Sequence, residues 1–238
     1  MADSRTSTVS AVRWCLRIVV ALQCAGYFAH SRFGETDVFE FLFLTADLSE
    51  TTALAISQVG SGLLLAAGVA ILVIRSNALL YGISLWFAAS AAADMQLGGA
   101  PFTHLALLTH SVRYLAPVAL ALFESDAPAD WSRAQKLLHV AVGVTFITHG
   151  WEALQTHPRF VDYLLMTSRR FPGPVLAEST ATTMLTVIGY VDVIVGLAVL
   201  SGAKWRALLL YLAAWGTVAA FARMTHGGFW QFPATLVR

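Results

Sequence analysis

Ten ionisable side chains lie within apolar stretches of this sequence, and these residues are the best placed to do chemistry. A charged group at the centre of a membrane helix costs about 2.5–3.5 kcal/mol on insertion scales, so such groups usually mark functional sites. Carboxylates and imidazoles can relay protons, and with an arginine they can bind a polar headgroup. The ten residues are Arg17, Asp94, His110, Arg113, His139, His149, Glu152, Asp192, Arg223 and His226.

The first candidate site is a polar or proton-relay site made of His149, Glu152, Asp192, Arg223 and His226. His149 and Glu152 are three residues apart, as are Arg223 and His226, so each pair shares one face of its helix. We expect both pairs near the outer membrane surface, where they could relay protons to a quinone ring. The alternative for Arg223 is that it only extends to the interface from near its helix end.

The second candidate site lies near the bilayer midplane and contains His110, Arg113 and Asp192. An ion pair between Asp192 and Arg113 would lower the cost of burying both charges. The alternative is structural, with Asp192 in a buried pair that fixes the register of its helix. Arg17 is expected to extend to the interface.

The stretches that carry these residues are long enough to cross a bilayer, which takes roughly 20 apolar residues. The 238-residue chain is 57% hydrophobic and only 12% charged, against about 25% charged in soluble domains. We therefore predict an all-α, polytopic membrane helical bundle of about seven transmembrane helices. Their expected ranges are roughly 12–29, 52–74, 77–97, 102–123, 136–155, 180–201 and 205–224.

Basic residues in the connections predict the orientation of the chain. Arg75, Arg133, Lys136, Lys204 and Arg206, in the short connections, fall on the side of the N-terminus. The bias is modest, because the long loops on the other side carry Arg32, Arg159, Arg169 and Arg170. Because basic loops stay in the cytoplasm, we expect a cytoplasmic N-terminus and an outer C-terminus, in the inner (plasma) membrane of a bacterium. The net charge of only +1 excludes a basic surface for nucleic acid. The expected partner is the lipid bilayer.

The two halves of the sequence resemble each other. Acidic and aromatic stretches at 37–44 and 159–166 each follow a long helix and are expected at the outer interface, and Gly-Gly turns occur at 98–99 and 227–228. We predict two tandem four-helix-type repeats, with the last helix missing from the second. The domains are then 1–123, a cytoplasmic linker at 124–135, and 136–238. The alternative is chance similarity between membrane helices. If the last helix of the second repeat is missing, either the second half is shortened or residues 229–238 lie along the outer surface.

Metal and haem are not favoured by the histidines. His149 and Glu152 form H-x-x-E, the reverse of the E-x-x-H order of di-iron bundles, and the motif has no second copy. Haem would need two imidazoles at the same depth, and only His149 and His226 approach that arrangement. No metal site is predicted, haem is judged unlikely to fit, and a quinone is the candidate ligand.

Residues 143–154 resemble the first-helix signature of the DoxX-like membrane family. Gly143, Phe146, His149, Gly150 and Leu154 follow its pattern G-x-x-F-x-x-H-G-x-x-x-L. Residues 188–200 are similar to its second helix, in which a glycine precedes an acidic residue and a further glycine. The matching positions there are Gly189, Asp192 and Gly196. Two departures are the missing last helix and Glu152, where the family commonly has a neutral or basic residue.

The resemblance implies a four-helix membrane unit, doubled in this chain, and a role beside redox enzymes. We therefore expect the membrane subunit of a redox system, on its quinone side or as its anchor, with a partner redox protein on the outer face. Two alternatives stay open. One is a small transporter or lipid-binding protein with a midplane site, and the other is a membrane scaffold without chemistry.

Overall fold

All regular structure is helical among the residues that the computed structural model describes, which are 2–98, 101–125, 127–203 and 205–237. Long apolar side chains such as Leu63, Leu85 and Leu210 face outward and are exposed. Together with the long apolar helices, they indicate an integral membrane protein in a lipid bilayer. The prediction of an all-α polytopic bundle is confirmed. Seven stretches are long and apolar enough to span: Val9–Phe33, Glu50–Val73, Asn77–Leu97, Thr103–Glu124, Pro128–Leu154, Glu178–Leu200 and Arg206–Gly227.

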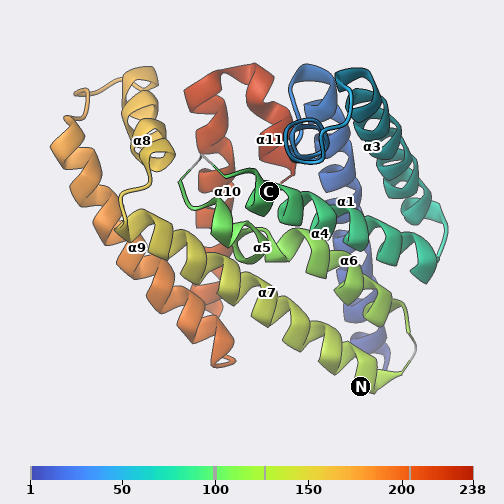
Figure 1. The fold of residues 1–238 in the computed structure, drawn as a ribbon. Helices are drawn as coiled ribbons and strands as arrows, with labels where there is room; N and C mark the ends of the chain where they lie inside the picture. The colour runs from blue at the N-terminus through green and yellow to red at the C-terminus, as the bar shows by residue number, and fades with distance from the viewer. Residues whose placement is uncertain (1, 99–100, 126, 204, 238) are drawn as a thin grey trace.

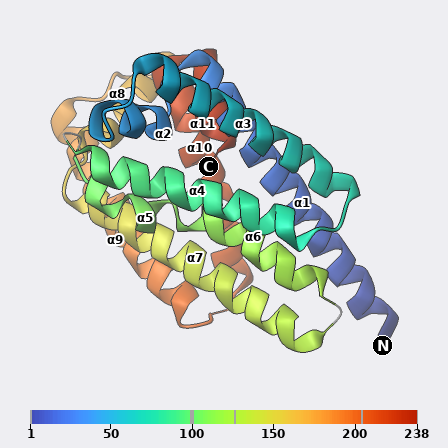
Figure 2. The same cartoon turned by 45° about the vertical axis from the view of Figure 1, so that its right-hand side comes forward.

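The long helices run between two ends of the bundle (Figures 1 and 2). One end carries α8 and the start of α3, and the other carries the first turns of α1. The long helices are α1 (Ala2–Phe33), α3 (Glu50–Val73), α4 (Asn77–Leu97), α6 (Ser111–Glu124), α7 (Pro128–Leu154), α9 (Glu178–Leu200) and α10 (Arg206–Gly227). The short ones are α2 (Asp37–Glu40), the π-helix η1 (Phe41–Thr45), the 3₁₀-helix η2 (Thr103–Leu105), α5 (Ala106–Thr109), α8 (Pro158–Arg170), the 3₁₀-helix η3 (Phe229–Gln231) and α11 (Phe232–Leu236).

Local sequence sets most of the helix starts. The hydroxyls of Ser49 and Ser76 accept hydrogen bonds from backbone N–H groups in the first turns of α3 and α4. Such caps satisfy donors that have no partner within the helix. Pro128 and Pro158 occupy the first positions of α7 and α8, where proline costs no helical hydrogen bond.

One predicted helix is interrupted, and one predicted helix start was wrong. The fourth span is not one helix, because it is interrupted at His110 between α5 and α6. The predicted linker at 124–135 is largely helical, since α6 ends at Glu124 and α7 already begins at Pro128. The polar residues at 129–136 hid a helix start that Pro128 supplies.

The order of elements in the second half follows that of the first. Each half has a long helix, a short helix at the α8 end, and two further long helices. A glycine with positive φ then follows, Gly98 (φ 61°) or Gly228 (φ 79°), before a 3₁₀ turn and a short helix. Only glycine adopts this conformation easily. The similarity thus extends from sequence to element order, and its origin in a duplication stays a prediction.

After three exposed residues at 229–231, the end of the described chain turns back into the bundle. α11 packs against α1, and Pro233 and Val237 are buried there. A Cβ added to Gly26 of α1 would lie 2.9 Å from the Pro233 carbonyl oxygen. The close approach of α11 therefore depends on this glycine. The prediction of a tail along the surface fits only residues 229–231, which are exposed, whereas α11 packs into the bundle. Arg238 lies outside the described residues.

The tightest helix contact joins α7 to α9 through two pairs of glycines. Gly150 faces Gly189, and Gly143 faces Gly196. Seven residues separate the glycines on each helix, which places both on one face. Small residues let membrane helices approach until their backbones touch. This contact fixes the position of α7, which carries His149 and Glu152.

Candidate functional site

A row of rings lies at the α8 end of the bundle. The His157 ring stacks on Phe160 with 4.7 Å between centroids and lies 5.2 Å from Phe102. Phe160 is 6.3 Å from Tyr163, and Tyr163 is 5.4 Å from His226 in an edge-to-face contact. The row joins the loop before α5 to α8 and to the end of α10. We call these five residues the ring row.

His149 and Glu152 form a polar pair beside the ring row. Nδ1 of His149 is 2.9 Å from Oε2 of Glu152, and the His149 ring lies 5.9 Å from Phe160. Glu152 is 6% exposed, whereas His149 retains about a quarter of its side-chain surface. A buried carboxylate that is hydrogen-bonded to an accessible imidazole can pass a proton between a dry site and its surroundings.

α10 contributes the second pair. The Arg223 guanidinium lies 5.6 Å from the centre of the Tyr163 ring, which also contacts His226. The hydroxyls of Thr167 and Thr225 are 2.5 Å apart and link α8 to α10. The structure thus brings both predicted pairs to one ring row, with His149 beside its middle ring, Phe160, and with Arg223 and His226 at Tyr163. Arg223 contacts an aromatic face here, a cation–π arrangement, and its Nη1 donates to the carbonyl of Ala219 one turn earlier on α10.

Asp192 lies apart from this group. Its carboxylate accepts hydrogen bonds from the Tyr211 hydroxyl and the Trp215 indole N–H, each at 3.3 Å, and the residue is 6% exposed. Arg223 is eight residues beyond Trp215 on the same helix, which corresponds to about 12 Å. Asp192 therefore does not belong to the site around α8, and the grouping predicted from sequence separates into two sites.

The predicted midplane site is also divided. The partners of Asp192 are on α10, whereas His110 and Arg113 lie where α5 gives way to α6, and α6 packs against α4 and α7. His110 is buried at this break, and Arg113 interacts electrostatically with His30 of α1. The Asp192–Arg113 ion pair is not formed, because each residue faces a different set of helices.

The sequence interpretation missed an arginine cluster at the other end of the bundle. Arg17, which was expected to extend to the interface, is buried, and its Nη2 lies 2.7 Å from Oε1 of Glu124. Arg75 Nε is 3.4 Å from Oε2 of the same carboxylate. Arg13 donates to the carbonyls of Phe123 and Ser125 at the end of α6. The sequence did contain a signal for this cluster, since Glu124 ends the fourth span and Arg13 and Arg17 lie within the first helix.

The bonds of Asp192 give a testable structural role. The backbones of α9 and α10 hardly approach each other, and α10 packs mainly on α8 and α11. We therefore expect Asp192→Ala to loosen α10 and to lower stability by about 1–3 kcal/mol, the range for two hydrogen bonds to a buried acceptor in a membrane. Thermal unfolding in detergent measures this loss, and Trp215 fluorescence reports the local change. Tyr211→Phe, which removes one bond, should give a smaller loss, and equal stability of all three proteins would contradict the role.

Comparisons with protein-family models, with curated proteins and with solved structures find no match to this chain. The resemblance to the DoxX-like family therefore stays a prediction from the sequence.

Proposed function

We propose that this protein is the membrane subunit of a DoxX-like redox system and exchanges protons with a ring-headed membrane carrier, a quinone, beside α8. The observation that carries the proposal is the His149–Glu152 pair, with a buried carboxylate 2.9 Å from an accessible imidazole. Phe160 next to this pair belongs to a row of rings that a planar aromatic ligand could join.

The chemistry of the residues at this site fits a quinone. Oxidation of a quinol releases two protons and two electrons, and the electrons would pass to a partner redox protein on the same side of the membrane. Glu152 would accept a proton in the dry site, and His149 would deliver it to the exposed side. On the side of the site away from Glu152, Tyr163 would bind the quinone by a hydrogen bond and Arg223 by its positive charge.

Three further features belong to the same proposal. The membrane is the inner (plasma) membrane of a bacterium, the N-terminus lies in the cytoplasm, and the α8 end faces outward. The short connections support this orientation, because Arg75, Arg133 and Arg206 lie at the end opposite to α8, although α8 itself carries Arg159, Arg169 and Arg170. The transporter alternative has less support, because Asp192 is separated from His110 and Arg113.

Glu152→Gln tests the function. We expect this variant to lower quinol oxidation by membranes that contain the protein and its partner at least tenfold, because an amide cannot accept the proton. The measurement is the rate of oxidation of a short-chain ubiquinol or menaquinol, with binding followed separately by quenching of tryptophan fluorescence. His139→Gln, thirteen residues earlier on α7, is the matched control and should leave both unchanged. Unaltered turnover in Glu152→Gln would refute the proton role, and absence of quinol binding to the unmodified protein would refute the ligand.

A further inference from the structure

The arginine end of the bundle contains a pocket with an excess of positive charge. Its lining comes from α1, from the turn between α3 and α4, and from the end of α6. Three arginines and one carboxylate line it, so two positive charges are in excess. Arg75 is the accessible member, with 67% of its side chain exposed, and its Nε lies 3.4 Å from Glu124, which pairs more closely with Arg17. The lining residues are Ser10, Arg13, Trp14, Arg17, Arg75 and Glu124.

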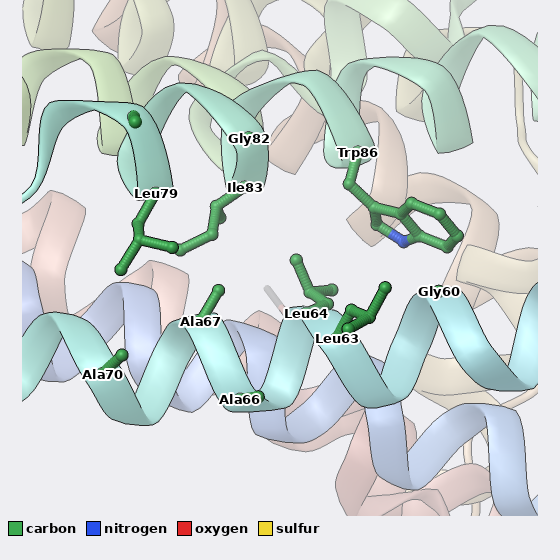
Figure 3. A pocket seen from close by; sticks show the side chains of 11 residues that line it. Gly60, Leu63, Leu64, Ala66, Ala67, Ala70, Leu79, Gly82, Ile83 and Trp86 are labelled. Carbon is green, nitrogen blue, oxygen red and sulfur yellow. The ribbon is translucent and has the colours of Figure 1, made fainter.

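An apolar groove begins beside this pocket and runs between α3 and α4 (Figure 3). Its volume is about 510 Å³, within the range of ~300–1,000 Å³ that is usual for ligand sites. Ala70 in the last turn of α3 and Ala78 in the first turn of α4 line the near end. Arg75 lies in the short connection between these two turns, so the charged pocket and the groove meet at this residue.

The length of the groove matches one leaflet of a bilayer. Along α3 the lining extends from Ala70 to Gly60, which is ten residues or about 15 Å. This is half of the ~30 Å thickness of the hydrocarbon core. Trp86 closes the far end, where its indole ring lies so close to Gly60 that an added Cβ would be 1.8 Å from the ring (Figure 3). The groove therefore has the reach of one acyl chain and a definite stop.

We propose that the pocket and groove form one binding site for an anionic phospholipid of the leaflet at the arginine end. The phosphate is bound at Arg75 within the positive field of Arg13 and Arg17, and one acyl chain fills the groove up to Trp86. Basic pockets between membrane helices are suited to such headgroups because guanidinium groups bind phosphate in a bidentate manner. This site is separate from the one beside α8, and it does not depend on the function proposed for that site.

Two variants test the two halves of the site independently. Arg75→Gln removes the accessible charge, and Arg75→Lys keeps it. Gly82→Leu fills the groove, and the position tolerates a side chain because nothing lies within 4 Å of its Cβ site. Gly62→Leu is the matched control, since Gly62 on α3 is equally open and does not line the groove.

The measurement is lipid binding to the purified full chain in detergent, by native mass spectrometry. The probes are phosphatidylglycerol, phosphatidylcholine with the same chains, and inorganic phosphate. We expect phosphatidylglycerol to bind at least fivefold more tightly than phosphatidylcholine. Arg75→Gln should abolish that preference, Arg75→Lys should retain most of it, Gly82→Leu should weaken both lipids at least fivefold, and Gly62→Leu should change nothing.

Three results would overturn the proposal. Equal binding of both lipids by the unmodified protein would show that charge does not select the ligand. Binding of inorganic phosphate, together with a phosphatidylglycerol affinity that Gly82→Leu leaves unchanged, would assign the pocket to a free anion. A dimer that Gly82→Leu converts to a monomer would assign the groove to a second copy of the chain.

Discussion

Replacing Glu124 with Leu is expected to destabilise the protein by about 3–5 kcal/mol, because it leaves the Arg17 guanidinium buried without its carboxylate. Both side chains are largely inaccessible, and they bridge α1 and α6 across 107 residues of sequence. The thermal midpoint in detergent should fall strongly, and the yield of folded protein should fall with it.

The paired variant separates lost packing from uncompensated charge. Arg17→Leu alone should also be costly, since it leaves Glu124 with only the looser contact to Arg75. The double variant Arg17→Leu, Glu124→Leu removes both charges and should be more stable than either single variant. A double variant that loses the sum of the two single losses would show that the ion pair contributes no coupling.

The predictable parts of the site are those set by spacing on one helix. His149 and Glu152 are three residues apart on α7, and their contact follows from helical geometry alone. To predict that Arg223 and His226 lie in the same region, one must know that α7 and α10 end on the same side of the membrane. The count of membrane spans gives this, because α7 is the fifth span and α10 the seventh.

The partners of Asp192 could have been found from the sequence but were missed. Asp192 lies ten residues before the turn at Gly202, and ten residues after this turn lies the stretch between Tyr211 and Trp215. An antiparallel hairpin places these residues at one depth, and both carry donors. The prediction instead paired the only strong charges at mid-depth, Asp192 and Arg113, without evidence that their helices are neighbours.

The remaining features depend on tertiary packing. The ring row needs Phe102 from one loop, Phe160 from α8 and His226 from α10, and no periodicity connects these segments. The Arg17–Glu124 pair similarly needs α1 beside α6. The break at His110 also has no proline or glycine at that position, and Pro117 instead lies within the continuous helix α6.

Gly150→Leu is expected to have the largest effect on the α8 end, because it forces α7 away from α9. A Cβ at Gly150 would lie 2.8 Å from the backbone oxygen of Gly189 and 2.9 Å from the side chain of Val193. Backbone cannot move aside as a flexible side chain can, so the helices must separate. We expect a loss of several kcal/mol, at the upper end of the ~1–3 kcal/mol that is usual for overpacking, and a displaced His149–Glu152 pair.

The glycine contact gives a graded test of this geometry. Gly150→Ala adds only the Cβ and should lower the thermal midpoint in detergent less than Gly150→Leu. Gly216→Leu on α10 is the matched control, because nothing lies within 4 Å of its Cβ site, and it should fold as the unmodified protein does. If Gly150→Leu and Gly216→Leu unfold at the same temperature, α7 and α9 do not touch at Gly150. If the contact is real, the same substitution must also weaken the proton exchange assigned to Glu152, since Glu152 is only two residues further along the displaced helix.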